Sequence, residues 1–214
     1  MFMNSRYFAT VRRATWMPCS LRISAILLSL IGLVGGSAST IFLIIERMAV
    51  AEQAPPSSRP GVSVLLRDIL SPARVALRLP ATSKKVLFQS LGNLLAAGDS
   101  GVDPLAVFHG LTERERLGST GIGEAVAIPH ARLKGLPRPL GALTVLERPV
   151  DYQAIDGRPV RLVFALLVPE EAATGHLQLL ALLARRFNNP AVRERMLQAK
   201  SVPELYNALV EEPS

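Results

Sequence analysis

Residues 160–168 read VRLVFALLV, a nearly continuous apolar run that Pro169 ends. A strand with one solvated face alternates apolar and polar residues, whereas a strand covered on both faces does not. The run therefore predicts a central strand in a sheet that carries helices on both sides.

Capping signals place helices before and after this strand. The helices are expected from Thr82 or Ser83 to about Ala97, from Asp103-Pro104 to about Leu117, from about Thr174 to Phe187, and after Asn189-Pro190 and Ser201-x-x-Glu204. Further extended segments are expected at Val75–Leu79, Ala125–Ile128 and Leu140–Leu146. Helices, then strands, then helices predict one α/β domain with a mixed β-sheet flanked by helices on both sides.

Composition suits a globular domain with extra segments, because 49% of the 214 residues are hydrophobic and 19% are charged. Cys19 is the single cysteine, which excludes an internal disulfide framework. The net charge is +7, and six arginines against two glutamates in residues 1–60 supply +4 of it. The rest of the chain is only mildly basic and has no basic block with interleaved aromatic residues, so no nucleic-acid partner is expected.

The three histidines, His109, His130 and His176, are the first candidates for chemistry. Their spacing gives no metal-binding pair and no cysteine lies near them, so no metal is expected. The sequence has no G-x-S-x-G motif for a serine hydrolase. It also has neither a Walker A loop nor G-x-G-x-x-G, and neither a nucleotide nor another cofactor is expected.

A histidine nucleophile for phosphoryl transfer remains, and residues 111–132 (LTERERLGSTGIGEAVAIPHAR) contain the parts that it requires. His130 supplies the imidazole, and Arg114 supplies a cation for the phosphoryl charge. A glycine-rich loop supplies hydrogen-bond donors. The loop consists of Ser119, Thr120, Gly121 and Gly123. Taken without context, a histidine after a proline in a loop also suits a residue with no catalytic role.

The same stretch, from Leu111 to His130, closely resembles the active-site signature L-T-x-R-E-x-x-G-S-T-G-I-G-x-x-x-A-I-P-H. This is the signature of enzyme IIA of the mannitol/fructose class in the bacterial phosphotransferase system, especially its nitrogen-regulatory branch. Further segments resemble the family in order along the chain. They are Ser83-Lys84-Lys85, Pro149–Gly157, Val163–Pro169 and Gly175–Ala184.

The resemblance implies a mannitol-type IIA fold over residues 62–212 and assigns roles to three side chains. His130 resembles the phosphorylated histidine, His176 the second active-site histidine, and Arg114 the basic residue beside them. His176 also lies where a helix is expected to begin, and a helix N-terminus favours a nearby anion. His109 has no counterpart role and is expected to be structural or on the surface.

The resemblance implies a phosphotransferase-system component that accepts phosphate on His130 from a histidine phosphocarrier protein. In the nitrogen-regulatory branch, its phosphorylation state would set its binding to regulatory target proteins. The alternative is a sugar-specific IIA that passes phosphate to a IIB domain during fructose or mannitol uptake. A third hypothesis is an interaction module without phosphotransfer, against which the presence of His130, His176 and Arg114 argues.

Residues 1–47 form an N-terminal extension, and residues 48–61 a linker before the domain. Residues 23–45 are uncharged and long enough to span a bilayer, with arginines before them. They predict either a membrane anchor or a cleaved signal, both of which would export the domain away from cytoplasmic partners. The third interpretation is that Met48 is the true start. On it we expect a cytoplasmic protein, with membrane contact only if residues 23–45 are translated.

Overall fold

A computed structural model describes residues 62–97, 101–171 and 175–211, with side chains for 66–97, 101–171 and 177–211. The extension at 1–47, its apolar segment at 23–45 and the linker at 48–61 lie outside the described residues. Within the described part of the chain, no helix is both long and apolar enough to cross a membrane.

Six strands form one mixed sheet in the order β1-β5-β6-β3-β2, and β4 also pairs with β6. The strands are β1 (Leu70–Leu79), β2 (Gly121–Gly123), β3 (Val126–Ala127), β4 (His130–Leu133), β5 (Leu140–Val150) and β6 (Val160–Pro169). Strands β1 and β5 are parallel, as β3 and β4 are to β6, whereas β5 and β6 are antiparallel. The mixed sheet predicted from the sequence is therefore confirmed.

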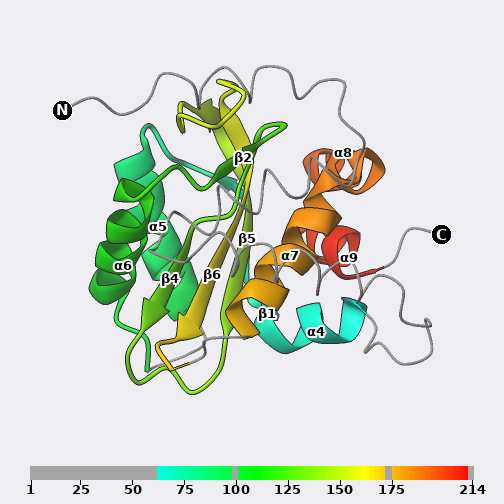
Figure 1. The fold of residues 1–214 in the computed structure, drawn as a ribbon. Coiled ribbons are helices and arrows are strands. Elements are labelled where there is room, and N and C mark those ends of the chain that lie inside the picture. The colour runs from blue at the N-terminus through cyan, green and yellow to red at the C-terminus, as the bar shows by residue number, and fades with distance from the viewer. Residues whose placement is uncertain (1–61, 98–100, 172–174, 212–214) are drawn as a thin grey trace, which may run out of the picture.

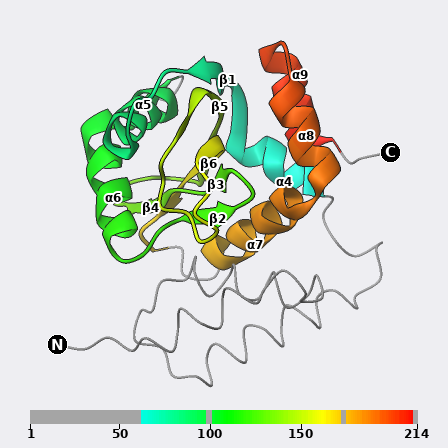
Figure 2. The same ribbon diagram turned by 90° about the horizontal axis from the view of Figure 1, so that it is seen from above.

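Helices cover both faces of the sheet, as Figures 1 and 2 show. One side carries α5 (Lys84–Ala96) and α6 (Pro104–Arg116). The other side carries four helices. They are α4 (Val62–Ile69), α7 (Gly175–Asn188), α8 (Pro190–Gln198) and α9 (Val202–Val210). This arrangement confirms the prediction of helices on both sides.

Strand β6 lies at the centre of this sandwich and contributes to both of its apolar cores. Phe164 and Leu166 pack into the core beneath α7, α8 and α9. Val163, Ala165 and Leu167 pack into the core beneath α5 and α6. All five side chains are fully buried, which explains why this stretch of sequence lacks polar alternation.

Helix starts lie where the capping residues predict them. Ser83 accepts a hydrogen bond from the Val86 amide, and Asp103 accepts from the first-turn amides of α6. Asn189 and Ser201 cap α8 and α9 in the same way. Each cap satisfies amides that have no partner inside the helix.

Two elements are absent from the sequence-based prediction. Val62–Ile69 forms helix α4, and its short apolar run does not distinguish a helix from a strand. His130, expected in a loop, begins strand β4, where it is the register partner of Leu166 on β6. The pairing depends on a strand far along the chain, which local sequence does not reveal.

Candidate functional site

Helix α6 and strand β4 bring Arg114 and His130 together. Arg114 lies in the last turn of α6, and His130 is the first residue of β4. The Nε atom of Arg114 donates to Nε2 of His130 at 2.9 Å. A second hydrogen bond, from Nη1 of Arg114 to the Gly118 carbonyl at 3.0 Å, ties the guanidinium to the end of its own helix.

The hydrogen bonds of the His130 ring assign roles to its two nitrogens. Nδ1 lies 2.9 Å from the carbonyl oxygen of Ile128, which can only accept, so Nδ1 carries the proton. Nε2 accepts from Arg114, so this nitrogen holds the lone pair. The geometry therefore describes a neutral imidazole whose nucleophilic atom is Nε2.

The His130 side chain is only 3% exposed. A histidine that receives a group from a partner protein has to be reachable by that partner. The ring is buried because β4 belongs to the sheet, and Arg114 covers its nucleophilic nitrogen. For Nε2 to attack an incoming group, the Arg114 guanidinium has to leave that nitrogen.

Arg114 is half-buried, and burial lowers the pKa of its guanidinium from the ordinary value, with neighbouring Glu115 acting in the opposite direction. Because the ordinary pKa of a guanidinium lies far above neutral pH, the side chain still provides a positive charge there. A guanidinium that donates to Nε2 in the resting state can donate to an anion once that anion is bound to Nε2.

Glu115, the next residue on α6, anchors the loop that follows. Its Oε2 accepts from the Thr120 amide at 3.0 Å and from the Thr120 hydroxyl at 2.6 Å. Its Oε1 pairs with Nζ of Lys84 from α5 at 2.8 Å. The carboxylate thus joins two helices to the loop at 118–123, with only 8% of its side chain exposed.

Tyr152 closes this network from the segment that follows β5. Its hydroxyl lies 2.9 Å from the Thr120 hydroxyl, and the ammonium of Lys84 lies 4.4 Å from the centre of its ring. The ring is fully buried, and burial together with Glu115 raises the pKa of the phenol well above its usual value. Tyr152 therefore remains a neutral hydrogen-bonding group throughout the physiological range.

The other loop residues lie against the same segment. The Ser119 hydroxyl has the Tyr152 carbonyl and the Gly121 amide as partners, both at 3.3 Å. A Cβ on Gly121 would lie 2.8 Å from Cβ of Ala154, so only glycine fits there. Gly123 has φ +90, a conformation that favours glycine.

The two remaining histidines have different places in the fold. His176 is the second residue of α7, so it lies at the expected helix start, but its side chain is outside the described residues. His109 is exposed on α6, where its ring makes an edge contact with Phe108 at 5.4 Å. The structure thus brings Arg114 and the loop to His130, and places His109 on the surface.

Sequence reasoning gave no role to Lys84, Glu115 or Tyr152, although all three lie in the segments that carry the family resemblance. Their shared network joins positions separated by 31 to 37 residues. The signal that was available is the family signature, which contains the glutamate of R-E-x-x-G at Glu115 and a lysine of S-K-K at Lys84. Among the described residues, no group of three or more His, Cys, Asp or Glu side chains could hold a metal ion.

Comparisons with known proteins show the family to which the chain belongs. The nitrogen regulatory protein of Pseudomonas aeruginosa is 41% identical over 148 residues, which cover 69% of this chain and 96% of that relative. The crystal structure of nitrogen regulatory protein IIA-Ntr from Neisseria meningitidis superposes with a TM-score of 0.64 at 40% identity, over 68% of this chain and 99% of that one.

A third structure shows the fold alone, because its identity is 22%. It is the Escherichia coli complex of enzyme IIA for mannitol with phosphorylated enzyme IIB, at a TM-score of 0.55 over 67% of this chain and 98% of that one. Residues 68–212 match the sequence profile described as phosphoenolpyruvate-dependent sugar phosphotransferase system, EIIA 2. The chain therefore belongs to the EIIA 2 family of the phosphotransferase system, and within it is similar to the nitrogen regulatory proteins.

Proposed function

We propose that this protein carries a phosphoryl group on Nε2 of His130, which it accepts from a histidine phosphocarrier protein. The observation that carries the proposal is the pair of hydrogen bonds to the His130 ring. Ile128 holds the proton on Nδ1, and the lone pair at Nε2 faces the cation of Arg114.

In the transfer step, the Nε2 lone pair forms a bond to the phosphorus of the phosphorylated donor. The bond from phosphorus to the donor nitrogen breaks, and its electron pair returns to that nitrogen. Nδ1 keeps its proton, which stays hydrogen-bonded to the Ile128 carbonyl oxygen. The phosphorylated ring is therefore cationic and offsets part of the phosphoryl charge. No metal or further reactant enters this balance.

Arg114 has two positions in this proposal. At rest it donates to Nε2, and after transfer it donates to the phosphoryl oxygens, where a guanidinium is a strong partner. Its bond to the Gly118 carbonyl keeps it near the loop in the meantime. We place His176 on the side of the phosphoryl group opposite Arg114. His176 lies at the start of α7, and a helix N-terminus favours an anion.

We place the loop of Ser119, Thr120, Gly121 and Gly123 beside the phosphoryl group. The Thr120 hydroxyl has short hydrogen bonds of 2.6 and 2.9 Å, so it stays with Glu115 and Tyr152 and fixes the loop. The partners of the Ser119 hydroxyl lie at 3.3 Å, so this is the group that turns to a phosphoryl oxygen.

The biological role that we propose is regulation in the nitrogen branch, with the phosphorylation state setting which target proteins bind. The 41% identity to a nitrogen regulatory protein supports this role. The mannitol enzyme IIA, which was solved with its IIB partner, shares only the fold with this chain.

The test is phosphate transfer from a labelled, phosphorylated histidine phosphocarrier to the full-length chain. His130→Ala should abolish the uptake of label, whereas the matched variant His109→Ala should retain it, because His109 lies exposed on α6. Uptake that survives in His130→Ala contradicts the proposal. Adding a IIB domain then separates the roles, since rapid loss of label to IIB would support sugar transport in place of regulation.

A further inference from the structure

A second cavity lies away from His130, between the sheet and the connection from α8 to α9. Its volume is about 510 Å³, within the range of small-ligand sites. Leu77, Val145 and Leu197 provide apolar walls, and Arg78, Arg161 and Lys200 provide positive charge. Arg161 is five residues from Leu166, the register partner of His130, which places the two sites about 17 Å apart along β6.

Three adjacent strands gather the two arginines at this cavity. Leu77 on β1 is the register partner of Val145 on β5, and Val145 is the partner of Leu162 on β6. Arg78 and Arg161 are the chain neighbours of the two outer residues. Since adjacent strands are about 4.8 Å apart, the backbones of the two arginines lie about 10 Å from each other.

A β-bulge gives Arg78 an unusual backbone. Leu77 and Leu79 pair with consecutive residues of β5, so Arg78 is the extra residue. Its φ is +54, a left-handed conformation that favours glycine and that bulky residues rarely adopt. Bulges redirect side chains, and strained backbone gathers at functional sites. A charged side chain held in this conformation beside a cavity is an observation that packing does not explain.

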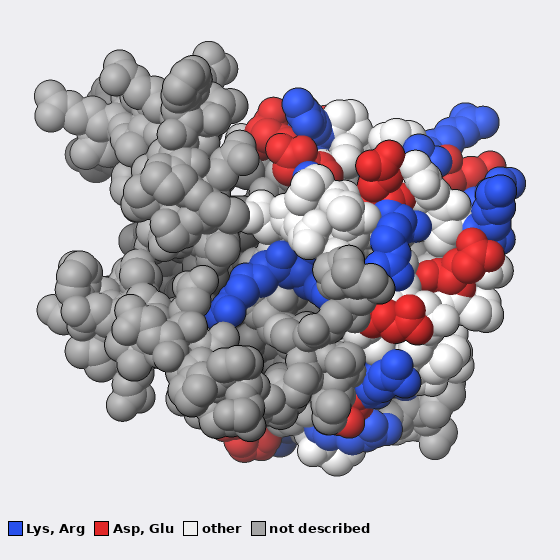
Figure 3. All heavy atoms as spheres, turned by 90° about the vertical axis from the view of Figure 1, so that its right-hand side faces the viewer, with Lys and Arg blue, Asp and Glu red and all other residues white. Residues whose placement is uncertain are grey.

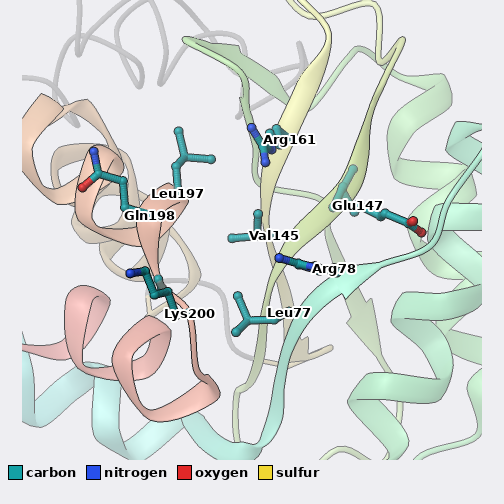
Figure 4. A pocket seen from close by; sticks show the side chains of 10 residues that line it. Leu77, Arg78, Val145, Glu147, Arg161, Leu197, Gln198 and Lys200 are labelled. Atoms are coloured by element: carbon teal, nitrogen blue, oxygen red, sulfur yellow. The ribbon is translucent and has the colours of Figure 1, made fainter.

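Arg78 and Arg161 are exposed at the cavity, whereas Lys200 lies close enough to Glu204 to interact with its carboxylate electrostatically. Neither the Arg78 nor the Arg161 guanidinium has a hydrogen bond or ion pair with any residue that the structure describes. Glu147 is the single acidic residue of the lining, and Figure 4 shows its carboxylate turned away from both arginines. On the part of the surface in Figure 3 that is not drawn in grey, acidic and basic side chains interleave.

We propose that this cavity binds a small organic phosphate. Arg78 and Arg161 both line the cavity, and a guanidinium group matches the oxygens of a phosphoryl group, which arginine holds with paired hydrogen bonds. The apolar walls suit the ring or carbon chain of such a molecule. This site uses none of the residues of the phosphoryl-transfer site, so the proposal stands independently of the proposed function.

The test maps amide shifts of the isotope-labelled full-length protein by NMR during titration with three probes. The probes are inorganic phosphate, glucose 6-phosphate and adenosine diphosphate. We expect saturable shifts at residues 77–79, 145–147 and 197–200, stronger for an organic phosphate than for inorganic phosphate. No saturable shift at these residues with any probe overturns the proposal, as does a shift confined to the surroundings of His130.

Variants then test the two arginines by calorimetry. Arg78→Met and Arg161→Met should each weaken binding about tenfold or more, because each removes a charged hydrogen-bonding partner. Glu147→Gln should strengthen binding, because it removes the negative charge from the lining. Arg148→Met removes the same charge from an exposed residue of β5 outside the lining and should leave the affinity within about twofold.

Equal weakening by Arg148→Met would show that the probes respond only to net charge, and would overturn the site. Arg78→Gly provides a second variant that removes the guanidinium and also relieves the left-handed backbone. It should fold at least as well as the wild type and still lose binding. Full affinity in Arg78→Gly would also contradict the proposal.

Discussion

Individual hydrogen bonds determine what His130 can do. A histidine with two donors would be a cation without a nucleophilic atom, whereas the partners of this ring leave the lone pair on Nε2. Arg114 both covers that lone pair and supplies the charge that a phosphoryl group needs. In the proposed function, this contact covers Nε2 at rest and places a cation where it would stabilise a phosphoryl group.

The residues around Glu115 give the site its rigidity. The carboxylate holds the Thr120 amide and hydroxyl, and Lys84 balances its charge from α5. Tyr152 adds a neutral hydroxyl in a position where a second charge would be unfavourable. Because Arg114 and Glu115 are neighbours on α6, a change in this network is expected to move Arg114 as well.

Tyr152→Phe should change how stability depends on pH. The pKa of Tyr152 is raised by burial, so the folded protein holds the phenol proton more tightly than the unfolded chain, whose value is near 10.0. The stability that this provides is complete below pH 10 and is lost as pH rises through the folded-state pKa. Replacing the tyrosine removes that loss.

The measurement is urea unfolding of both proteins at several values from about pH 8 to about pH 11. At the lower end the variant should be less stable by about 1 kcal/mol, because it lacks one hydrogen bond. Toward the upper end the difference should shrink. Tyr206→Phe is the control, since Tyr206 is only partly buried. A constant difference across the range would refute a raised pKa.

The sequence identifies Arg114 and His130 more readily than the residues that surround them. Arg114 and His130 lie in one continuous motif, so the resemblance identifies both. The contact of Glu115 with Tyr152 spans 37 residues and depends on how the segment after β5 returns to α6. The local sequence does not reveal the burial of His130 for the same reason, because the burial follows from pairing between distant strands.

The turn between β2 and β3 has a strained backbone, because both of its residues have positive φ. Glu124 and Ala125 have φ of +54 and +60, where a two-residue hairpin usually has asparagine and glycine. The turn is held by a hydrogen bond from the Glu124 amide to Asp156 at 2.8 Å and by two amides that donate to the Ala125 carbonyl. It lies between the loop and His130, so its shape influences both.

Ala125→Gly should therefore stabilise the protein by about 1 kcal/mol, because glycine adopts a positive φ without steric cost. The control is Glu113→Gly, on the exposed face of α6, which should destabilise by about 1 kcal/mol. The free energy of unfolding in urea distinguishes the two. Destabilisation by Ala125→Gly would show that the turn carries no strain.

Elements with local signals were predicted well. Each of the caps Ser83, Asp103, Asn189 and Ser201 begins a helix, because a side chain that satisfies free amides acts within one turn. Helix α4 and strand β4 were not predicted. The first is a short apolar run that suits either structure, and the second is a four-residue strand defined by its pairing with β6.

On the scale of the whole molecule, one strand connects two apolar cores. Strand β6 contributes Phe164 to the core beneath α7, α8 and α9, and Leu167 to the core beneath α5 and α6. The core beneath α5 and α6 lies next to Arg114 and His130, the proposed phosphoryl-transfer site, whereas the proposed phosphate cavity opens on the other face. The two sites lie about 17 Å apart along β6.

Phe164→Ala and Leu167→Ala should each destabilise the protein by about 2–5 kcal/mol, because each leaves a cavity in a core. The two losses of stability should be comparable, because β6 is buried on both of its faces. Leu105→Ala, at a residue that is 61% exposed, should change stability by less than about 0.5 kcal/mol. Urea unfolding measures all three, and a small loss on one face would contradict a two-sided core.

The most direct test of phosphoryl transfer to His130 locates the phosphorus atom in the phosphorylated protein. The chain, labelled with ¹⁵N in its histidines, is phosphorylated by the histidine phosphocarrier and examined by ³¹P and ¹⁵N NMR without exposure to acid, which hydrolyses the phosphorus–nitrogen bond. We predict coupling between phosphorus and Nε2 of His130, with the proton still on Nδ1. Phosphorus on Nδ1 of His130, or on any other residue, would contradict the account.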